Sequence, residues 1–245
     1  MLLSKCCRDK LIKTIRADER HFSNFDWLKT YWLFSFDTYY DEKNLNFGAL
    51  RVFNDDVVGP KKGFPPHFHK EMEIVTIVLD GEVTHQDNMK NKAVIKAGDV
   101  QRMSAGSGIT HSEYNSAEKP VHFYQIWIYP DQTGLKPAYE QKSFSSLLKK
   151  NALLPVASGQ GFEGAIKMHT DSTIYLAEIG KGESIDFKTN PSRGVFVYLT
   201  KGDMSINGQR LKSNDQGRIS DESNVKLKAN EDANLVLIDV PTHKD

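Results

Sequence analysis

Residues 67–87 read HFHKEMEIVTIVLDGEVTHQD, and this stretch decides how the first half of the chain folds. The apolar run EIVTIVL ends at Asp80-Gly81 and is followed by EVTHQD, a pattern typical of two β-strands joined by a turn. His67 and His69 precede this hairpin and lie two positions apart. Because side chains alternate between the two faces of a strand, both imidazoles are expected on one face.

A second stretch, GDVQRMSAGSGITHSEYN at residues 98–115, carries the matching half of a site. His111 and Glu113 are also two positions apart and therefore share a face. Gly106 and Gly108 allow a tight approach of the backbone to this strand. If the two strands meet, three imidazoles and one carboxylate converge, which predicts a metal site.

The predicted ligands are a mixed nitrogen and oxygen set that suits Fe(II), Mn(II), Ni(II), Cu(II) or Zn(II). Four protein ligands leave about two positions open on an octahedral ion. A structural zinc site is normally closed and rich in cysteine. The open positions therefore favour chemistry or ligand capture at one metal ion per chain.

Other polar residues of the first half are candidates for supporting the ligands or lining the pocket. Glu73 has the strand parity of His67 and could be a fifth ligand, although a hydrogen-bonded place beside the ligands fits it better. The remaining candidates for the pocket walls are expected to pack or to support the ligands rather than to be catalytic, and they are His85, Asp87, His122, Gln125 and Trp127. Phe68 is expected in the core, and Trp27, Trp32, Phe34 and Phe36 are expected to pack a sheet or close the barrel mouth.

From Phe47 onward the chain consists of short apolar runs separated by turn signals, which predicts an all-β fold. The stretch YEQKSFSSLLKKNALL, residues 139–154, is the best candidate for a short helix. The β pattern then resumes, and GVFVYLTKGDMSING loosely repeats IVTIVLDGEVTHQ. We therefore expect two similar domains, residues 1–135 and 136–245. The second contains no H-x-H pair, only the isolated His169 and His243.

Composition narrows the partners and the compartment. Lys plus Arg and Asp plus Glu are both 32, so the formal net charge is zero, which argues against nucleic acid or an anionic membrane as the main partner. Cys6 and Cys7 are adjacent and have no distant partner, which favours a reducing compartment. The start MLLSKCC is too short an apolar run for a signal peptide. We expect a cytoplasmic protein.

At this point the residues carry a family resemblance. H-x-H-x3-E followed by a glycine turn, and then G-x5-S-x-G before a histidine, resemble the two motifs of the cupin superfamily. Ser104 stands where cupins commonly have proline, and four residues separate Gly106 from His111. Together with the upstream FGALRVFNDDVV, these departures resemble the pirin family, over roughly residues 16–140.

The resemblance implies a bicupin: two facing antiparallel β-barrels with a short helical connection, with metal only in the N-terminal barrel. The family's ligands correspond to His67, His69, His111 and Glu113, whereas pirins generally do not use the carboxylate at Glu73. It also implies a metal-dependent dioxygenase that acts on flavonols such as quercetin with O2, and we expect Fe(II) as the native ion, with Ni, Mn, Cu and Zn as the alternatives. Glu113 would be the catalytic base. The alternative is a metal-bearing, redox-sensing regulator that binds a partner protein.

Overall fold

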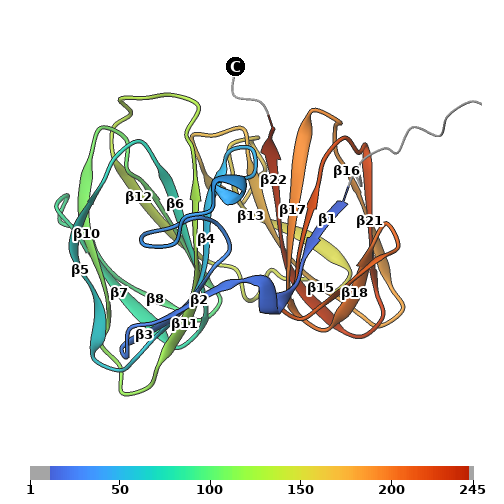
Figure 1. Cartoon of the computed structure of the whole chain (residues 1–245). Coiled ribbons are helices and arrows are strands. Elements are labelled where there is room, and N and C mark those ends of the chain that lie inside the picture. Colours follow the sequence, from blue (N-terminus) through green and yellow to red (C-terminus); the bar gives the residue numbers. More distant parts are fainter. Residues whose placement is uncertain (1–11, 243–245) are drawn as a thin grey trace, which may run out of the picture.

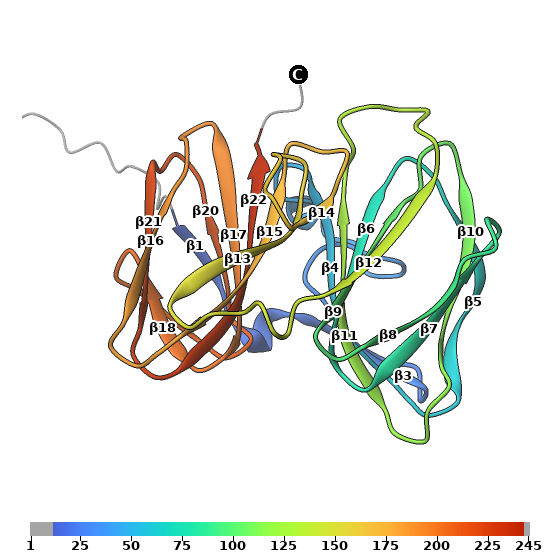
Figure 2. The same cartoon turned by 180° about the vertical axis from the view of Figure 1, so that it is seen from behind.

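The computed structural model describes residues 12–242, which form two β-barrels that lie side by side (Figures 1 and 2). Each barrel consists of a seven-stranded sheet facing a four-stranded sheet. The described residues contain no α-helix, only two single 3₁₀ turns, Ala17–Glu19 and Glu42–Asn44. Within residues 12–242 no helix is long and apolar enough to cross a membrane. Cys6, Cys7 and His243 lie outside the described residues.

The N-terminal barrel pairs the four-stranded sheet β5-β10-β7-β8 with the seven-stranded sheet β12-β9-β6-β11-β4-β3-β2. Its strands are β2 (His21–Asn24), β3 (Leu28–Trp32), β4 (Leu50–Val58), β5 (Lys62–His69), β6 (Glu73–Asp80), β7 (Glu82–Asp87), β8 (Lys92–Lys96), β9 (Asp99–Ser104), β10 (Ile109–Asn115), β11 (Val121–Ile128) and β12 (Ala138–Ser143).

The C-terminal barrel repeats this arrangement with the sheets β16-β21-β18-β19 and β1-β20-β17-β22-β15-β13-β14. Its strands are β1 (Ile12–Ile15), β13 (Ala152–Ser158), β14 (Ile166–Lys167), β15 (Thr173–Ile179), β16 (Ser184–Lys188), β17 (Arg193–Lys201), β18 (Asp203–Ile206), β19 (Gln209–Lys212), β20 (Gln216–Ile219), β21 (Asn224–Ala229) and β22 (Ala233–Pro241). The internal repeat expected from the sequence is therefore a repeat of topology.

Strand pairing crosses the expected boundary between residues 135 and 136 in both directions. Strand β1, from the start of the chain, pairs with β20 of the C-terminal barrel. Strand β12 lies beyond the boundary but pairs with β9 of the N-terminal barrel. The two barrels are thus interlocked by exchanged edge strands, and a cut at residue 135 would remove one edge strand from each of the two seven-stranded sheets.

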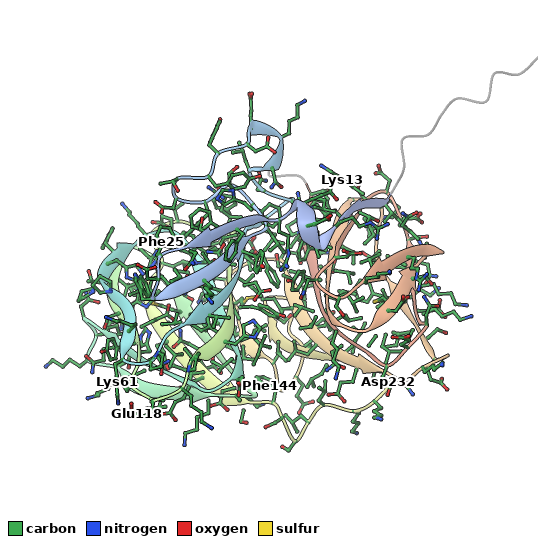
Figure 3. All side chains as sticks on the ribbon, turned by 60° about the horizontal axis from the view of Figure 1, so that its bottom comes forward. Lys13, Phe25, Lys61, Glu118, Phe144 and Asp232 are labelled. Atoms are coloured by element: carbon green, nitrogen blue, oxygen red, sulfur yellow. The ribbon has the colours of Figure 1, made fainter. Side chains whose placement is uncertain are left out.

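The main hydrophobic core lies between the barrels, where their large sheets face each other. Phe53 and Tyr124 from the N-terminal sheet meet Phe196 and Tyr198 from the C-terminal sheet, with ring centroids 5.0–5.4 Å apart. Side chains fill both barrels and the space between them (Figure 3). Since the outer face of each large sheet is buried in this junction, the inner face is left to build the interior of its barrel.

The prediction of a helix over residues 139–154 is wrong. Its first part is strand β12, which pairs in register with β9 from Ala138–Ser104 to Ser143–Asp99, and its last residues begin β13. Between them Asn151 has a φ of 61°, a left-handed conformation that a right-handed helix cannot contain. Phe144, which follows β12, is anchored in the core between the barrels. Pairing with an open sheet edge outweighed the local pattern.

Candidate metal centre

The histidines of the two sequence motifs are brought together by the pairing of β5 with β10. His111 lies directly opposite His67, and Ile109 lies opposite His69. A register shift between His111 and Glu113 interrupts the pairing with β5, whereas pairing with β7 on the other side runs on regularly. Residues 111 and 113 of β10 are buried and their neighbours less so, so both face the barrel interior as their spacing predicts.

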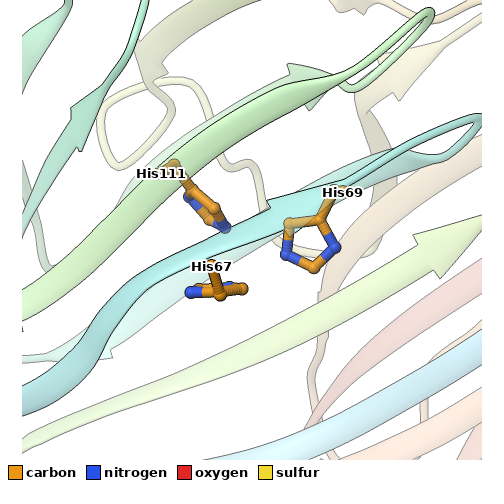
Figure 4. A group of neighbouring side chains, drawn as sticks. All are labelled: His67, His69 and His111. Carbon is orange, nitrogen blue, oxygen red and sulfur yellow. The ribbon is translucent and has the colours of Figure 1, made fainter.

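Three imidazoles converge inside the N-terminal barrel (Figure 4). One nitrogen each of His67, His69 and His111 lies within 4.8 Å of the other two. Their ring centroids are 4.4–4.9 Å apart. His69 and His111 are buried, and His67 is half-buried at the open side of the cluster. The arrangement places three nitrogen donors around a single point.

The protonation of these imidazoles suits metal binding. Burial, followed by the neighbouring histidines, lowers the pKa of both His69 and His111 to about 3, so both are neutral at pH 7. The Nε2 atoms of both are buried and make no hydrogen bond. His67 Nδ1 lies 2.8 Å from the Pro65 carbonyl oxygen and donates a hydrogen bond to it. The lone pair of His67 Nε2 is thereby available to a metal ion. Buried, unpartnered lone pairs aimed at one point fit a bound cation.

Glu113 lies beside the cluster and is held by the opposite sheet. Its Oε2 accepts a hydrogen bond of 2.6 Å from Gln125, and its Oε1 accepts longer ones from Thr76 (3.3 Å) and Gln101 (3.5 Å). Glu113 forms a second, overlapping ligand group with His111 and His85. His111 therefore belongs to both ligand groups, whereas Glu113 is grouped with His111 and His85 and not with His67 and His69.

The three residues that hold Glu113 belong to a polar row on the inner face of the seven-stranded sheet, which we call the floor of the barrel. Asn54, Gln125, Thr76 and Gln101 are successive cross-strand neighbours on β4, β11, β6 and β9. Only Gln125 was a candidate from the sequence. The missed signal is a polar residue in the middle of an otherwise apolar strand, as Thr76 is in EIVTIVL.

His85 and Asp87 support His111 from strand β7. His111 Nδ1 lies 3.4 Å from His85 Nδ1, and His85 Nε2 lies 3.1 Å from Asp87 Oδ2. Both side chains of the His85–Asp87 pair are fully buried. Neutral tautomers fit this chain if His111 donates to His85 and His85 donates to Asp87, which leaves His111 Nε2 free for a metal.

Glu73 does not share the face of the histidines. The chain turns between β5 and β6, where Glu71 has a φ of 50°, so the strand parity that links residue 73 to residue 67 is broken. Glu73 instead lies beside Ser104 and Arg102 on the side of the C-terminal barrel, and burial raises its pKa. The expectation that it lies beside the metal ligands is wrong.

Two further expectations also fail. His122 is an odd number of positions from Gln125, so it points to the other face of β11 and contacts Asp55 at 2.7 Å between the barrels. Phe68 faces away from the ligands as predicted but is 63% exposed rather than part of the core, because the outer face of the four-stranded sheet is open to solvent. Its ring covers Gly108, where a Cβ atom would clash with it.

Trp127 lies where the sequence placed it, against the centre. Its ring meets His69 edge-on, with centroids 4.9 Å apart, and its Nε1 donates to Gln125 Oε1 at 3.1 Å. Through Gln125 the indole thereby also fixes the group that holds Glu113. Trp127 supports a ligand on each side of the centre without offering a ligand atom itself.

Comparison with known proteins identifies relatives of the whole chain. Residues 15–128 match the Pirin family model, and residues 155–240 match the model described as the quercetinase C-terminal cupin domain. The chain is 41% identical to a quercetin 2,3-dioxygenase of Escherichia coli over 227 residues, 92% of this chain and 97% of that protein. It is 43% identical to a pirin-like protein of Caulobacter vibrioides over 214 residues, 87% and 92% of the two chains.

A solved structure agrees with these relatives. The crystal structure of the bacterial pirin YhhW from Escherichia coli, in complex with nickel(II), superposes with a TM-score of 0.90 at 39% identity. The match covers 95% of this chain and all of that one. The paired barrels, the histidine cluster and the full-length relatives lead to one conclusion: the chain belongs to the pirin family and has its bicupin fold.

Proposed function

We propose that this protein is a metal-dependent dioxygenase that opens the ring of flavonols such as quercetin with O2. We further propose that His67, His69, His111 and Glu113 bind one divalent metal ion, with iron as the native ion. The observation that carries the proposal is the cluster of three imidazoles beside the buried carboxylate of Glu113, in which the buried Nε2 atoms of His69 and His111 have no hydrogen-bond partner. Relatives named quercetin 2,3-dioxygenase support the reaction, and the nickel-bound pirin supports the metal.

The donor set fits the substrate. Four protein ligands leave about two positions of an octahedral ion for the 3-hydroxyl and 4-carbonyl oxygens of a flavonol. A bound divalent ion would supply Lewis acidity, lowering the pKa of the 3-hydroxyl. Glu113 is the nearest carboxylate and can take the released proton. Gln125, at 2.6 Å from Glu113, keeps the carboxylate in place while it does so.

The test is turnover by purified protein loaded with Fe(II). We expect flavonol-dependent uptake of O2 with a one-to-one stoichiometry and, with ¹⁸O2, both labelled atoms in the product. A flavone without the 3-hydroxyl is the matched substrate control and should not react. His169→Ala, a change of a histidine far from the cluster in sequence, is the matched protein control and should keep the activity.

The same assay separates the enzyme from a metal-bearing regulator. A protein with one bound Fe(II) per chain but no flavonol-dependent O2 uptake would contradict the dioxygenase. Retention of the metal in that case would leave a regulatory role for the centre.

A further inference from the structure

A cavity of about 210 Å³ lies in the N-terminal barrel next to the polar row, between β3, β4 and β11. Trp27, Trp32, Phe36 and Phe64 form its walls. Two T-shaped pairs organise them: Trp27 with Phe64 at 5.2 Å and Trp32 with Phe36 at 5.5 Å between centroids. Engineered cavities of about 150 Å³ admit benzene, so this one has room for an aromatic ring.

The cavity connects to the candidate metal centre through two side chains. Gln125 lines the cavity and donates to Glu113 at 2.6 Å. Phe36 lines it as well and meets Trp127 edge-on at 5.3 Å, and Trp127 in turn meets His69. A molecule in the cavity would therefore lie one side chain away from Glu113 and two side chains away from His69.

The polar row ends at this cavity with an unused acceptor. Gln125, Thr76 and Gln101 all donate to Glu113, but Asn54, the fourth member of the row, has a buried Oδ1 without a hydrogen-bond partner. Asn54 is 3% exposed and lines the cavity. An unpaired buried carbonyl oxygen is costly, so such a group indicates a ligand that donates a hydrogen bond.

Asp56 also lines the cavity and is 2% exposed. It lies two residues from Asn54 on the same face of β4, opposite Thr30 of β3. Burial raises the pKa of Asp56 to about 7, so at neutral pH a large fraction carries a proton that it can donate. Gln125, which already donates to Glu113, and the exposed Asp37 also line the cavity. With the acceptor of Asn54, the proton of Asp56 and the aromatic walls, the cavity suits a planar, hydroxylated ring.

We propose that this cavity binds a hydroxylated aromatic ring of the substrate, and that Asn54 Oδ1 accepts a hydrogen bond from a ring hydroxyl that does not bind the metal. This inference rests on the proposed function for the identity of the substrate. Asn54 is then the residue that distinguishes polyhydroxylated flavonols from those that carry only the chelating 3-hydroxyl and 4-carbonyl groups. Trp32, directly opposite Asn54 on β3, provides a stacking surface beside that contact.

The experiment compares the binding of quercetin with that of 3-hydroxyflavone, which keeps the chelating oxygens and lacks the other hydroxyls. Protein loaded with zinc is used, and quenching of tryptophan fluorescence reports binding because Trp27 and Trp32 line the cavity. We expect wild-type protein to bind quercetin about 10-fold more tightly, the effect of one buried hydrogen bond. Asn54→Leu, which keeps the volume and removes the acceptor, should abolish this preference and leave 3-hydroxyflavone binding and zinc content unchanged.

Asn54→Ser retains an oxygen acceptor and should keep part of the preference for quercetin over 3-hydroxyflavone. This variant provides a second test of the inference if Asn54→Leu folds poorly. Asn234→Leu makes the same chemical change at an exposed position of the C-terminal barrel and should behave as wild type. An unchanged preference in Asn54→Leu, or an equal loss of binding for both flavonols, would overturn the inference. Because the readout is binding to zinc-loaded protein, absence of turnover alone would contradict only the proposed reaction.

Discussion

The two barrels have the same strand order but different interiors. In the N-terminal barrel the strand pair β5 and β10 places His67 opposite His111. In the C-terminal barrel the corresponding pair, β16 and β21, places Ile185 opposite Leu227 and Phe187 opposite Val225. Among the described residues, both groups that could hold a metal ion lie in the N-terminal barrel. The backbone alone therefore does not make the site.

The floors of the barrels differ in the same way. Where the N-terminal floor carries the row Asn54, Gln125, Thr76 and Gln101, the corresponding neighbours on β15, β22, β17 and β20 are Tyr175, Leu237, Val197 and Gly217. Three of these four belong to one apolar core, and the side chain of Ile206 fills the space above Gly217. The comparison teaches that buried polar groups are tolerated in this fold when a polar partner on the facing sheet, here Glu113, completes their hydrogen bonds.

The largest effect is expected when the imidazoles that distinguish the N-terminal barrel are removed. The double variant His67→Ala/His111→Ala should lose nearly all bound metal, because only one of the three clustered imidazoles remains. Elemental analysis should find close to one metal per chain in wild type and in His169→Ala. Two metals per chain, or full retention in the double variant, would show that a second site exists.

The next effect concerns chemistry rather than metal binding. Glu113→Gln keeps the three imidazoles and an oxygen atom but removes the proton acceptor. We expect flavonol oxidation per bound metal to fall by ~10²–10⁴-fold, the range typical of a general base, with a smaller loss of metal. Metal content and rate are measured in the same preparation. If the rate per metal stays at the wild-type value, Glu113 is only a ligand.

A matched change in the other barrel should affect stability instead. Leu227, fully buried on β21, lies on the strand that corresponds to β10. Leu227→Ala should lower the free energy of unfolding by about 2–5 kcal/mol through lost burial and a residual cavity. Denaturant titration measures this, and metal content should not change. A loss of metal with native-like stability would argue that the C-terminal interior takes part in the site.

A smaller effect is expected from the chain of hydrogen bonds behind His111. Asp87→Asn removes the carboxylate that accepts from His85 at 3.1 Å and so loosens the orientation of His111. Groups in this position typically change metal affinity about 10- to 100-fold. Competition with a chelator measures the affinity. Wild-type affinity in Asp87→Asn would mean that His111 is oriented by the strand alone.

The sequence predicted the parts of the structure that depend on period-two alternation within one strand. The common face of His67 and His69, and that of His111 and Glu113, follow from residue spacing. Predictions failed where the argument crossed a turn, as for Glu73, or ignored parity, as for His122. The helix expected at residues 139–154 failed because an open edge of β9 captured residues 138–143, a long-range event that a local pattern does not encode. The polar floor was missed because its members come from four separate strands.

The last predicted effect is a pH dependence of stability that originates in the interior of the N-terminal barrel. The pKa of Asp56 rises from 3.8 to about 7, mainly through burial. The nearby Asp55 and Glu113 also raise it, whereas Thr30 and His122 lower it. Between these values the folded protein holds a proton that the unfolded chain releases. The stabilisation that comes from protonated Asp56 is therefore fully present below pH 3.8 and is lost as the pH rises toward 7. The free energy of unfolding falls by at most about 1.4 kcal/mol per pH unit in this range.

Asp56→Asn keeps the shape of the side chain and cannot titrate. The difference in unfolding free energy between the variant and wild type should therefore shift in favour of the variant as pH rises from 4.5 to 7, and then stay constant to pH 8. Urea titrations of metal-free protein across this pH range measure the unfolding free energies. For Leu227→Ala, an apolar change in the other barrel, the difference in unfolding free energy from wild type should not change with pH. Parallel curves for Asp56→Asn and wild type would mean that Asp56 is ionised when folded. The donor that we assign to the aromatic cavity would then be absent.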